Sequence, residues 1–147
     1  MRLPSPSPLV ELSYRPDLRI LVVRWLGVTT DEEIRQLYHH LQQVNTTQCR
    51  FWLLDARRRP SSSSGVTRWV FDEFAPPLAR QLGGPLYFSY LISPLHLVDA
   101  EGFRRVAESA GQTLPYRLHY ASQEGEATDW LIRAQEQEQA GAAVEQP

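Results

Sequence analysis

Lysine is absent from this chain of 147 residues, and all 15 of its basic residues are arginine. The absence excludes Schiff-base chemistry and a phosphate-binding loop of the Walker type, because each of these needs a lysine. Cysteine occurs once, as Cys49, so the chain can form neither an internal disulfide nor a cysteine-rich zinc site. The arginines face 17 acidic residues, and the resulting net charge of −2 excludes a strongly basic nucleic-acid-binding arm.

Long apolar runs are also missing. No stretch approaches the roughly 20 apolar residues that a helix needs to cross a bilayer. Residues 4–8 alternate proline with serine, where a signal peptide would have an apolar run. We therefore expect a cytoplasmic protein with no stable membrane insertion.

The length of the chain predicts a single domain over residues 9–134, preceded by a proline-rich lead-in, residues 1–8. The polar tail, residues 135–147, has no apolar stripe and is expected to fray or to be disordered.

Five segments have the apolar or alternating patterns of β-strands, namely residues 9–14, 18–25, 51–54, 86–92 and 116–120. The turn signal Arg15-Pro16-Asp17 separates the first two, which predicts an antiparallel hairpin. The third and fourth are continuously apolar, as is typical of strands covered on both faces. The last alternates, which favours an edge strand.

Four segments have helical patterns. Thr30 and Glu33 have the spacing of a capping box, and apolar residues follow at the spacing of one helix face. A second helix is predicted from Gly65, and Pro76-Pro77 is expected to break or kink it. Two more helices are predicted around residues 103–110 and 127–134.

The elements alternate in the order β-β-α-β-α-β-α-β-α. Strands that are separated by helices need crossover connections and therefore pair in parallel. The predicted fold class is α/β with α+β character: a mixed sheet of about five strands that opens with an antiparallel hairpin and carries helices packed on it.

Short motifs in these elements resemble a known family. They are Leu53-Leu54-Asp55, the serine-rich loop after it, Trp69, Tyr90-Leu91 with Ser93-Pro94, and Glu126-Ala127 with Trp130-Leu131. Over residues 9–134 the pattern resembles the STAS-like, or SpoIIAA-like, fold of bacterial regulatory domains. The resemblance implies a regulatory module that acts through contact with another protein.

The resemblance also points to the loop that follows the central strand. In anti-sigma-factor antagonists of this fold, a partner kinase phosphorylates the first serine of an Asp-Ser-Ser-Gly motif at a helix start. Here Ser62-Ser63-Ser64-Gly65 stands at that place, and Ser63 matches the phosphorylated serine. Ser62 replaces the aspartate of the motif.

The predicted ligand-binding or partner-binding loop consists of Asp55, Arg57, Arg58, Arg59, Ser62 and Ser64. Amide groups at a helix start bind anions, and arginine adds paired donors for phosphate or carboxylate. The alternative is a solvated loop that only caps the helix. Asp55 has a position suited to a general base, but no sequence neighbour supplies a nucleophile with an orienting base. His39 and His40 are about 100° apart on a helix and cannot face one metal ion together, so we expect no metal site. We expect no other cofactor.

Large apolar residues also surround the Pro76-Pro77 pair. These residues fall on more than one side of the helix, and they are Phe71, Phe74, Leu78 and Leu82. Such a helix either packs against a second subunit, borders an apolar pocket, or wraps the sheet of its own domain.

The sequence therefore predicts a non-enzymatic STAS-like module, homodimeric, that acts through a protein partner or a small ligand and does not bind nucleic acid. The alternative is a small-ligand or lipid carrier, or a small enzyme, with a pocket at the carboxyl ends of the strands near Asp55.

Overall fold

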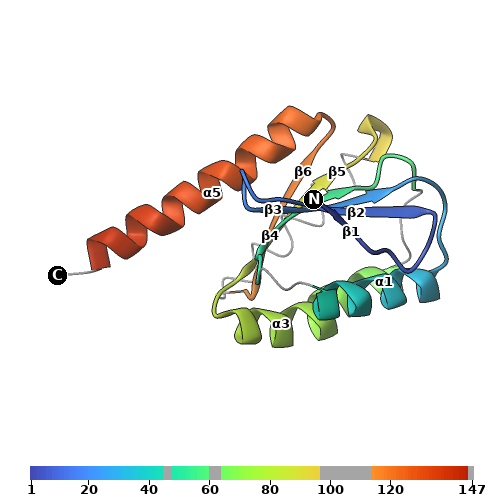
Figure 1. The fold of residues 1–147 in the computed structure, drawn as a ribbon, viewed down its shortest axis with the longest axis horizontal. Helices are drawn as coiled ribbons and strands as arrows, with labels where there is room; N and C mark the ends of the chain where they lie inside the picture. The colour runs from blue at the N-terminus through green and yellow to red at the C-terminus, as the bar shows by residue number, and fades with distance from the viewer. Residues whose placement is uncertain (45–47, 60–63, 97–113, 146–147) are drawn as a thin grey trace.

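The computed structural model describes residues 1–44, 48–59, 64–96 and 114–145 (Figure 1). The elements are β1 (Arg2–Leu3), β2 (Val10–Arg15), β3 (Ile20–Trp25), α1 (Asp31–Val44), β4 (Phe51–Asp55), α2 (Ser64–Trp69), the π-helix η1 (Val70–Phe74), α3 (Ala75–Leu82), β5 (Leu86–Leu91), the 3₁₀-helix η2 (Pro94–His96), β6 (Tyr116–Ala121) and α5 (Glu124–Glu145). The helix predicted around residues 103–110 lies outside the described residues.

The strands form one mixed sheet in the order β1-β2-β3-β4-β5-β6. The first three pair antiparallel, and β3 to β6 are parallel, which confirms the predicted fold class. The sheet has six strands instead of about five, because Arg2 and Leu3 pair with β2 before Pro4. A proline has no N–H to donate to a strand ladder, so β1 ends there.

The helix α1 begins as its sequence predicts. The amide of Glu33 donates to Thr30 Oγ1 at 3.1 Å, and the amide of Thr30 donates to the Glu33 carboxylate at 3.0 Å. These two bonds are the capping box. The apolar face of the helix is buried against the sheet through Ile34, Leu37, Tyr38 and Leu41.

The segment from α2 to α3 passes Pro76-Pro77 without a break. The amide of Ala75 donates to the carbonyl of Val70, five residues earlier, so the chain takes a wider π turn directly before the prolines. Both prolines then lie in the first turn of α3, where a missing N–H leaves no helical bond unmade. Gly83, at φ 80°, ends α3 in the left-handed conformation that glycine adopts without strain.

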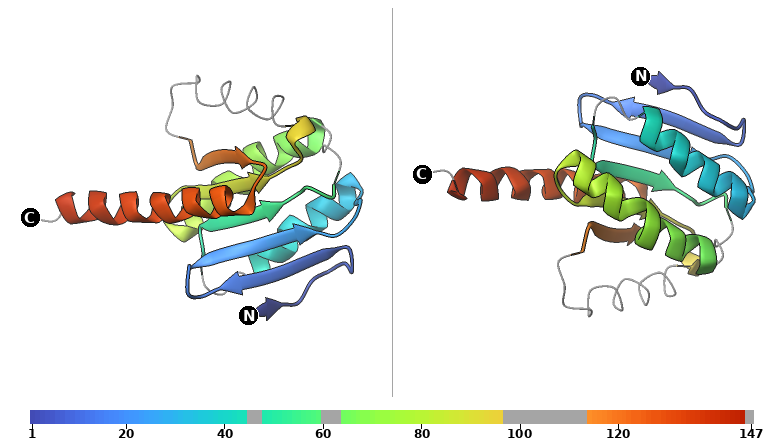
Figure 2. Two further views of the ribbon diagram at one scale, coloured as in Figure 1. Left: turned by 90° about the horizontal axis from the view of Figure 1, so that it is seen from above. Right: turned by 90° about the horizontal axis from the view of Figure 1, so that it is seen from below.

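The sheet is covered on both faces (Figures 1 and 2). One face packs against α1 and the α2–α3 segment, and the other packs against α5. Phe71, Phe74 and Leu78 are buried in the first of these cores, and Leu82 packs against it. The helix thus wraps its own sheet, and these residues no longer support a second subunit.

The helix α5 continues to Glu145, although residues 135–147 were predicted to fray. Its anchors are polar, which explains why no apolar stripe marks them. Gln135 Nε2 donates to the carbonyls of Leu18 and Arg19 at 3.0 and 3.1 Å. The Glu138 carboxylate accepts two bonds from Arg50, at 2.8 and 2.5 Å, and one from the Tyr87 hydroxyl at 2.8 Å. Beyond these contacts the helix projects past the sheet (Figure 2).

Within the described residues, no helix combines the length and the apolar character that a membrane crossing requires.

We predict that Leu131→Ala lowers the free energy of unfolding by about 3 kcal/mol, because it opens a cavity between α5 and the sheet. Leu131 is fully buried there beside Ile20 and Leu53. Urea unfolding followed by circular dichroism measures the change. The matched control is Gln137→Ala, at an exposed position of the same helix, which should change stability by less than about 0.5 kcal/mol. Equal effects of the two substitutions would contradict the packing of α5.

Candidate functional site at the carboxyl end of the sheet

The parallel strands β3 to β6 end on one side of the sheet, at Trp25, Asp55, Leu91 and Ala121. We call this side the carboxyl end. In open α/β sheets, ligands bind at this end of the strands. Most of the predicted site residues belong to the loop that leaves it after β4.

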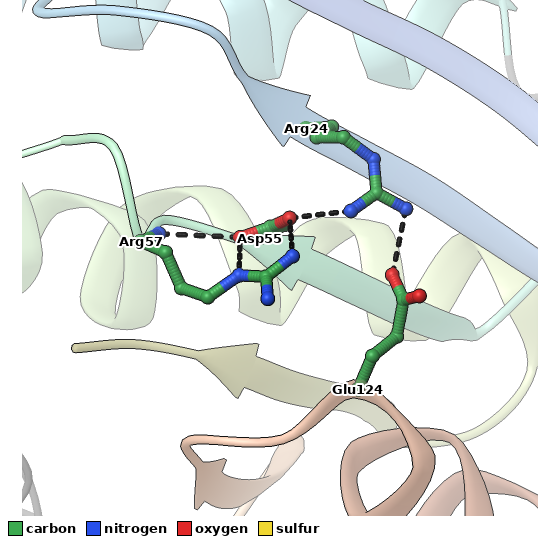
Figure 3. Close-up of polar contacts among 4 residues, drawn as sticks. All are labelled: Arg24, Asp55, Arg57 and Glu124. Carbon is green, nitrogen blue, oxygen red and sulfur yellow. Dashed lines mark hydrogen bonds and ion pairs between the residues drawn. The ribbon is translucent and has the colours of Figure 1, made fainter. Parts of the chain in front are cut away.

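Asp55, the last residue of β4, is buried with 4% of its surface exposed. Arg57 reaches back to it, with Nε at 2.9 Å from Oδ1, Nη2 at 2.8 Å from Oδ2, and its backbone amide at 3.2 Å from Oδ1. A fourth donor is Nη1 of Arg24, which also contacts Oδ2. Figure 3 shows the two guanidinium groups approaching the carboxylate from different sides.

Arg24 extends this cluster to the last helix. Because β3 and β4 are paired with Arg24 opposite Asp55, the two side chains leave neighbouring strands at the same level. The other terminal nitrogen of Arg24 donates to Glu124, in the first turn of α5, at 2.7 Å. The network of Arg24, Asp55, Arg57 and Glu124 therefore connects two central strands, the loop after β4 and the start of α5 (Figure 3).

The electrostatics of Asp55 are set by two opposing effects. Burial raises the pKa of its carboxyl group, but the hydrogen bonds and charge of Arg57, together with the charge of Arg24, outweigh burial and hold the pKa below its ordinary value. A carboxylate offers about four lone-pair sites, and the four donors occupy them. Asp55 is thus an ionised, saturated acceptor that neutralises arginine.

The three arginines of the loop differ in what they contact. Arg57 is bound to Asp55, and Arg58 is exposed. Arg59 places its guanidinium carbon 4.2 Å from the centre of the Trp25 ring, an arrangement stabilised by cation–π attraction. Its Nε atom is buried and has no hydrogen-bond partner among the residues that the structure describes.

Most serines of the predicted loop lie outside the residues that the structure describes. Ser62 and Ser63 lie outside the described residues, and Ser64 is the first residue of α2. The structure therefore brings Asp55 together with Arg57 and places Arg59 nearby against Trp25.

Two members of the network, Arg24 and Glu124, were not among the site residues predicted from the sequence. Arg24 is a charged residue in an otherwise apolar strand, and this was a usable signal for a buried partner. Glu124 had no such signal, because it is 100 residues from Arg24 along the chain.

The cysteine and the adjacent histidines considered in the sequence each lie in contacts that hold the fold together. Burial raises the pKa of the Cys49 thiol, which disfavours the reactive thiolate. His40 Nε2 forms a hydrogen bond of 2.7 Å with the carbonyl of Pro4, whereas the rings of His39 and Trp69 are in a T-shaped contact. No group of three or more metal-ligating side chains occurs in the part of the chain that the structure describes.

A cavity of about 270 Å³ lies along β1 and β2, away from Asp55. Its lining includes the paired side chains of Arg2 and Glu11 and the apolar residues Leu3, Val10 and Leu26. The alternative prediction required a pocket beside Asp55, and Asp55 does not line this cavity.

Comparison with known proteins gives no relative: no family model, no curated protein and no solved structure matches the chain.

We predict that Asp55→Asn lowers the free energy of unfolding by about 2 kcal/mol at pH 7, because hydrogen bonds to a charged group are lost and Arg24 loses its buried partner. The pKa of Asp55 is lower in the folded protein than in the unfolded chain. Its contribution is therefore complete above an unfolded pKa of about 3.9 and is lost as the pH falls through the lower folded value. Chemical unfolding from pH 7 to pH 2 should show the two proteins converging below about pH 4.

The control is Asp17→Asn, which breaks the exposed Arg15–Asp17 pair and should leave stability nearly unchanged. A difference between wild type and Asp55→Asn that stays constant down to pH 2 would contradict the ion-pair assignment.

Proposed function

We propose that the protein is a non-enzymatic, STAS-like regulatory or binding module, and that the carboxyl end of its sheet is the contact surface for a protein partner or a small ligand. The observation that carries the proposal is the saturation of Asp55. This carboxylate accepts four hydrogen bonds from Arg24 and Arg57. The acid at the strand end is therefore committed to holding the structure together.

The saturation argues against the enzymatic alternative. A general base needs a free lone pair within reach of its substrate and a pKa near the working pH. Asp55 has neither, because its lone pairs are occupied and its pKa is lowered. A catalytic role would also require both guanidinium groups to leave a buried charge, which is costly.

Exposed apolar side chains at the same end of the sheet support a contact surface. Leu26 and Val28 follow β3 and are 39% and 65% exposed, and Leu95 follows β5 and is 87% exposed. With Arg58 exposed after β4, the carboxyl end presents apolar and cationic groups together. Exposed apolar residues that gather in one region are typical of binding surfaces.

Two parts of the proposal rest on the sequence. Ser63 is the proposed phosphorylation site, because it matches the phosphorylated serine of the motif that the loop resembles. The arginines that precede it could stabilise the phosphate through their guanidinium groups. The proposed cytoplasmic location rests on the scarcity of cysteine.

We predict that a partner protein co-purifies with the tagged full-length chain from the cells that produce it, and that Arg58→Glu reduces its recovery at least tenfold. A tenfold loss of affinity corresponds to about 1.4 kcal/mol. A reversed charge within a contact costs more than this. Quantitative mass spectrometry measures recovery. The control is Arg80→Glu, which reverses an exposed charge at the far end of α3. Equal recovery with both variants, or no partner in stoichiometric amount, would refute the contact surface.

We predict that phosphate is found on Ser63 in protein isolated from the same cells, and that Ser63→Ala changes the recovery of the partner. Intact-mass and peptide mass spectrometry detect the phosphate and assign it to a residue. The comparison variant is Ser13→Ala, because Ser13 belongs to strand β2 and lies far along the chain from this loop. Absence of phosphate from residues 61–64, together with unchanged recovery, would remove the phosphorylation switch from the proposal.

A further inference from the structure

At the carboxyl end of the sheet, three buried side-chain donors have no hydrogen-bond partner among the described residues. They are Nε1 of Trp25, at the end of β3, Oγ1 of Thr29, in the connection to α1, and Nε of Arg59, in the loop after β4. Trp25 is 1% exposed. Buried polar groups in folded proteins are nearly always hydrogen-bonded, so a group of donors without acceptors calls for an explanation. The two N–H groups can only donate and the threonine hydroxyl can also donate, so an acceptor could satisfy all three.

Arg59 is the charged member of this group, and no described acid neutralises it. The nearest acid in sequence, Asp55, has its four acceptor sites filled by Arg24 and Arg57. Glu124 is bound to Arg24, and Glu33 accepts from the backbone of Thr30. Arg59 instead rests on the Trp25 ring at 4.2 Å, which fixes the direction of its planar group. Arg59 is half-buried, so solvent reaches part of its side chain.

We propose that Arg59, held against the Trp25 ring, is the binding group of a phosphate subsite at the carboxyl end of the sheet. The inference rests on the proposed function for the place of the contact surface and adds the class of ligand. A guanidinium group binds phosphate through two parallel hydrogen bonds. Since the Trp25 ring orients Arg59 before binding, little side-chain freedom is left to lose when the ligand arrives.

The local charge favours phosphate over a carboxylate. Of the three adjacent arginines, Arg57 is neutralised by Asp55, whereas Arg58 and Arg59 form no ion pair with any described residue. The loop therefore has an excess of two positive charges, which matches a phosphate group of charge near −2. Inorganic phosphate and a phosphorylated serine both offer this group, and the experiment separates them.

The test uses the full-length protein labelled with ¹⁵N. Inorganic phosphate, O-phosphoserine, acetate and sodium chloride are titrated separately at matched ionic strength, and the indole N–H signals are followed by NMR. Trp25→Phe identifies the Trp25 signal among those of the four tryptophans. The binding variants are Arg59→Gln and Arg59→Lys, and the matched control is Arg80→Gln. Thermal unfolding checks that each variant is folded.

We expect a saturable shift of the Trp25 signal with inorganic phosphate and with O-phosphoserine, and an affinity for acetate at least tenfold weaker. Arg59→Gln should weaken phosphate binding at least tenfold, Arg59→Lys should weaken it less, and Arg80→Gln should leave it unchanged. Tighter binding of O-phosphoserine than of inorganic phosphate would identify a phosphorylated protein segment as the source. Tighter binding of inorganic phosphate would identify the free ion.

Several results would overturn the subsite: no saturable shift, the same shift with sodium chloride, tighter binding of acetate, or unchanged phosphate affinity in a folded Arg59→Gln variant. The proposed function fails separately. If the partner is still recovered and depends on Arg58 while phosphate does not bind, only the subsite is wrong. If phosphate binds through Arg59 and no partner depends on Arg58, the protein-contact role is wrong and the subsite stands.

Discussion

A carboxylate buried at the end of a central strand must be surrounded by donors, because an isolated buried charge is far less stable than a solvated one. This constraint organises the carboxyl end of the sheet. It holds Arg24 of β3 beside Asp55 of β4, folds Arg57 back onto the strand it has just left, and brings Glu124 of α5 to Arg24. The loop after β4 consequently begins in a fixed direction, and Arg59 arrives next to Trp25.

The two faces of the sheet are stabilised in different ways. On the face of α1 and α3 the core is apolar and aromatic, with Trp52, Phe74 and Phe88 in edge-to-face contact. On the opposite face the apolar cluster is small, and polar contacts at its two ends fix α5 in place. Glu124 anchors the helix at the carboxyl end, and Gln135 and Glu138 anchor it at the other. Apolar area supplies most of the folding energy, while the polar anchors set the direction of α5.

Elements with local signals could be predicted from the sequence. The hairpin of β2 and β3 depends on a turn a few residues long, and α1 depends on a capping box and an apolar face contained in its own residues. The parallel pairing followed from the alternation of strands and helices. The loop after β4 was likewise identified as the candidate site from its composition and its place behind a buried strand.

Features that depend on distant residues could not be predicted in the same way. The polar anchors of α5 have no periodicity, so residues 135–145 read as a tail. The π turn of η1 reconciles the buried face of α2 with the prolines of α3, and only their joint packing reveals it. The apolar helix residues left three possibilities open, namely a second subunit, an apolar pocket and the sheet of the same domain, because the sequence does not say how far Phe71 and Phe74 turn toward the sheet.

The late position of α5 has a consequence for how the chain folds. Some of its contacts join residues 100 or more positions apart, such as Arg24 with Glu124 and Leu18 with Gln135. Such pairings carry a high entropic cost of loop closure and form slowly. During synthesis, Ile20, Val22 and Leu53 remain without their cover until α5 has left the ribosome. The nascent chain therefore exposes one apolar face of its sheet until α5 can cover it, the period in which a chaperone has most to bind.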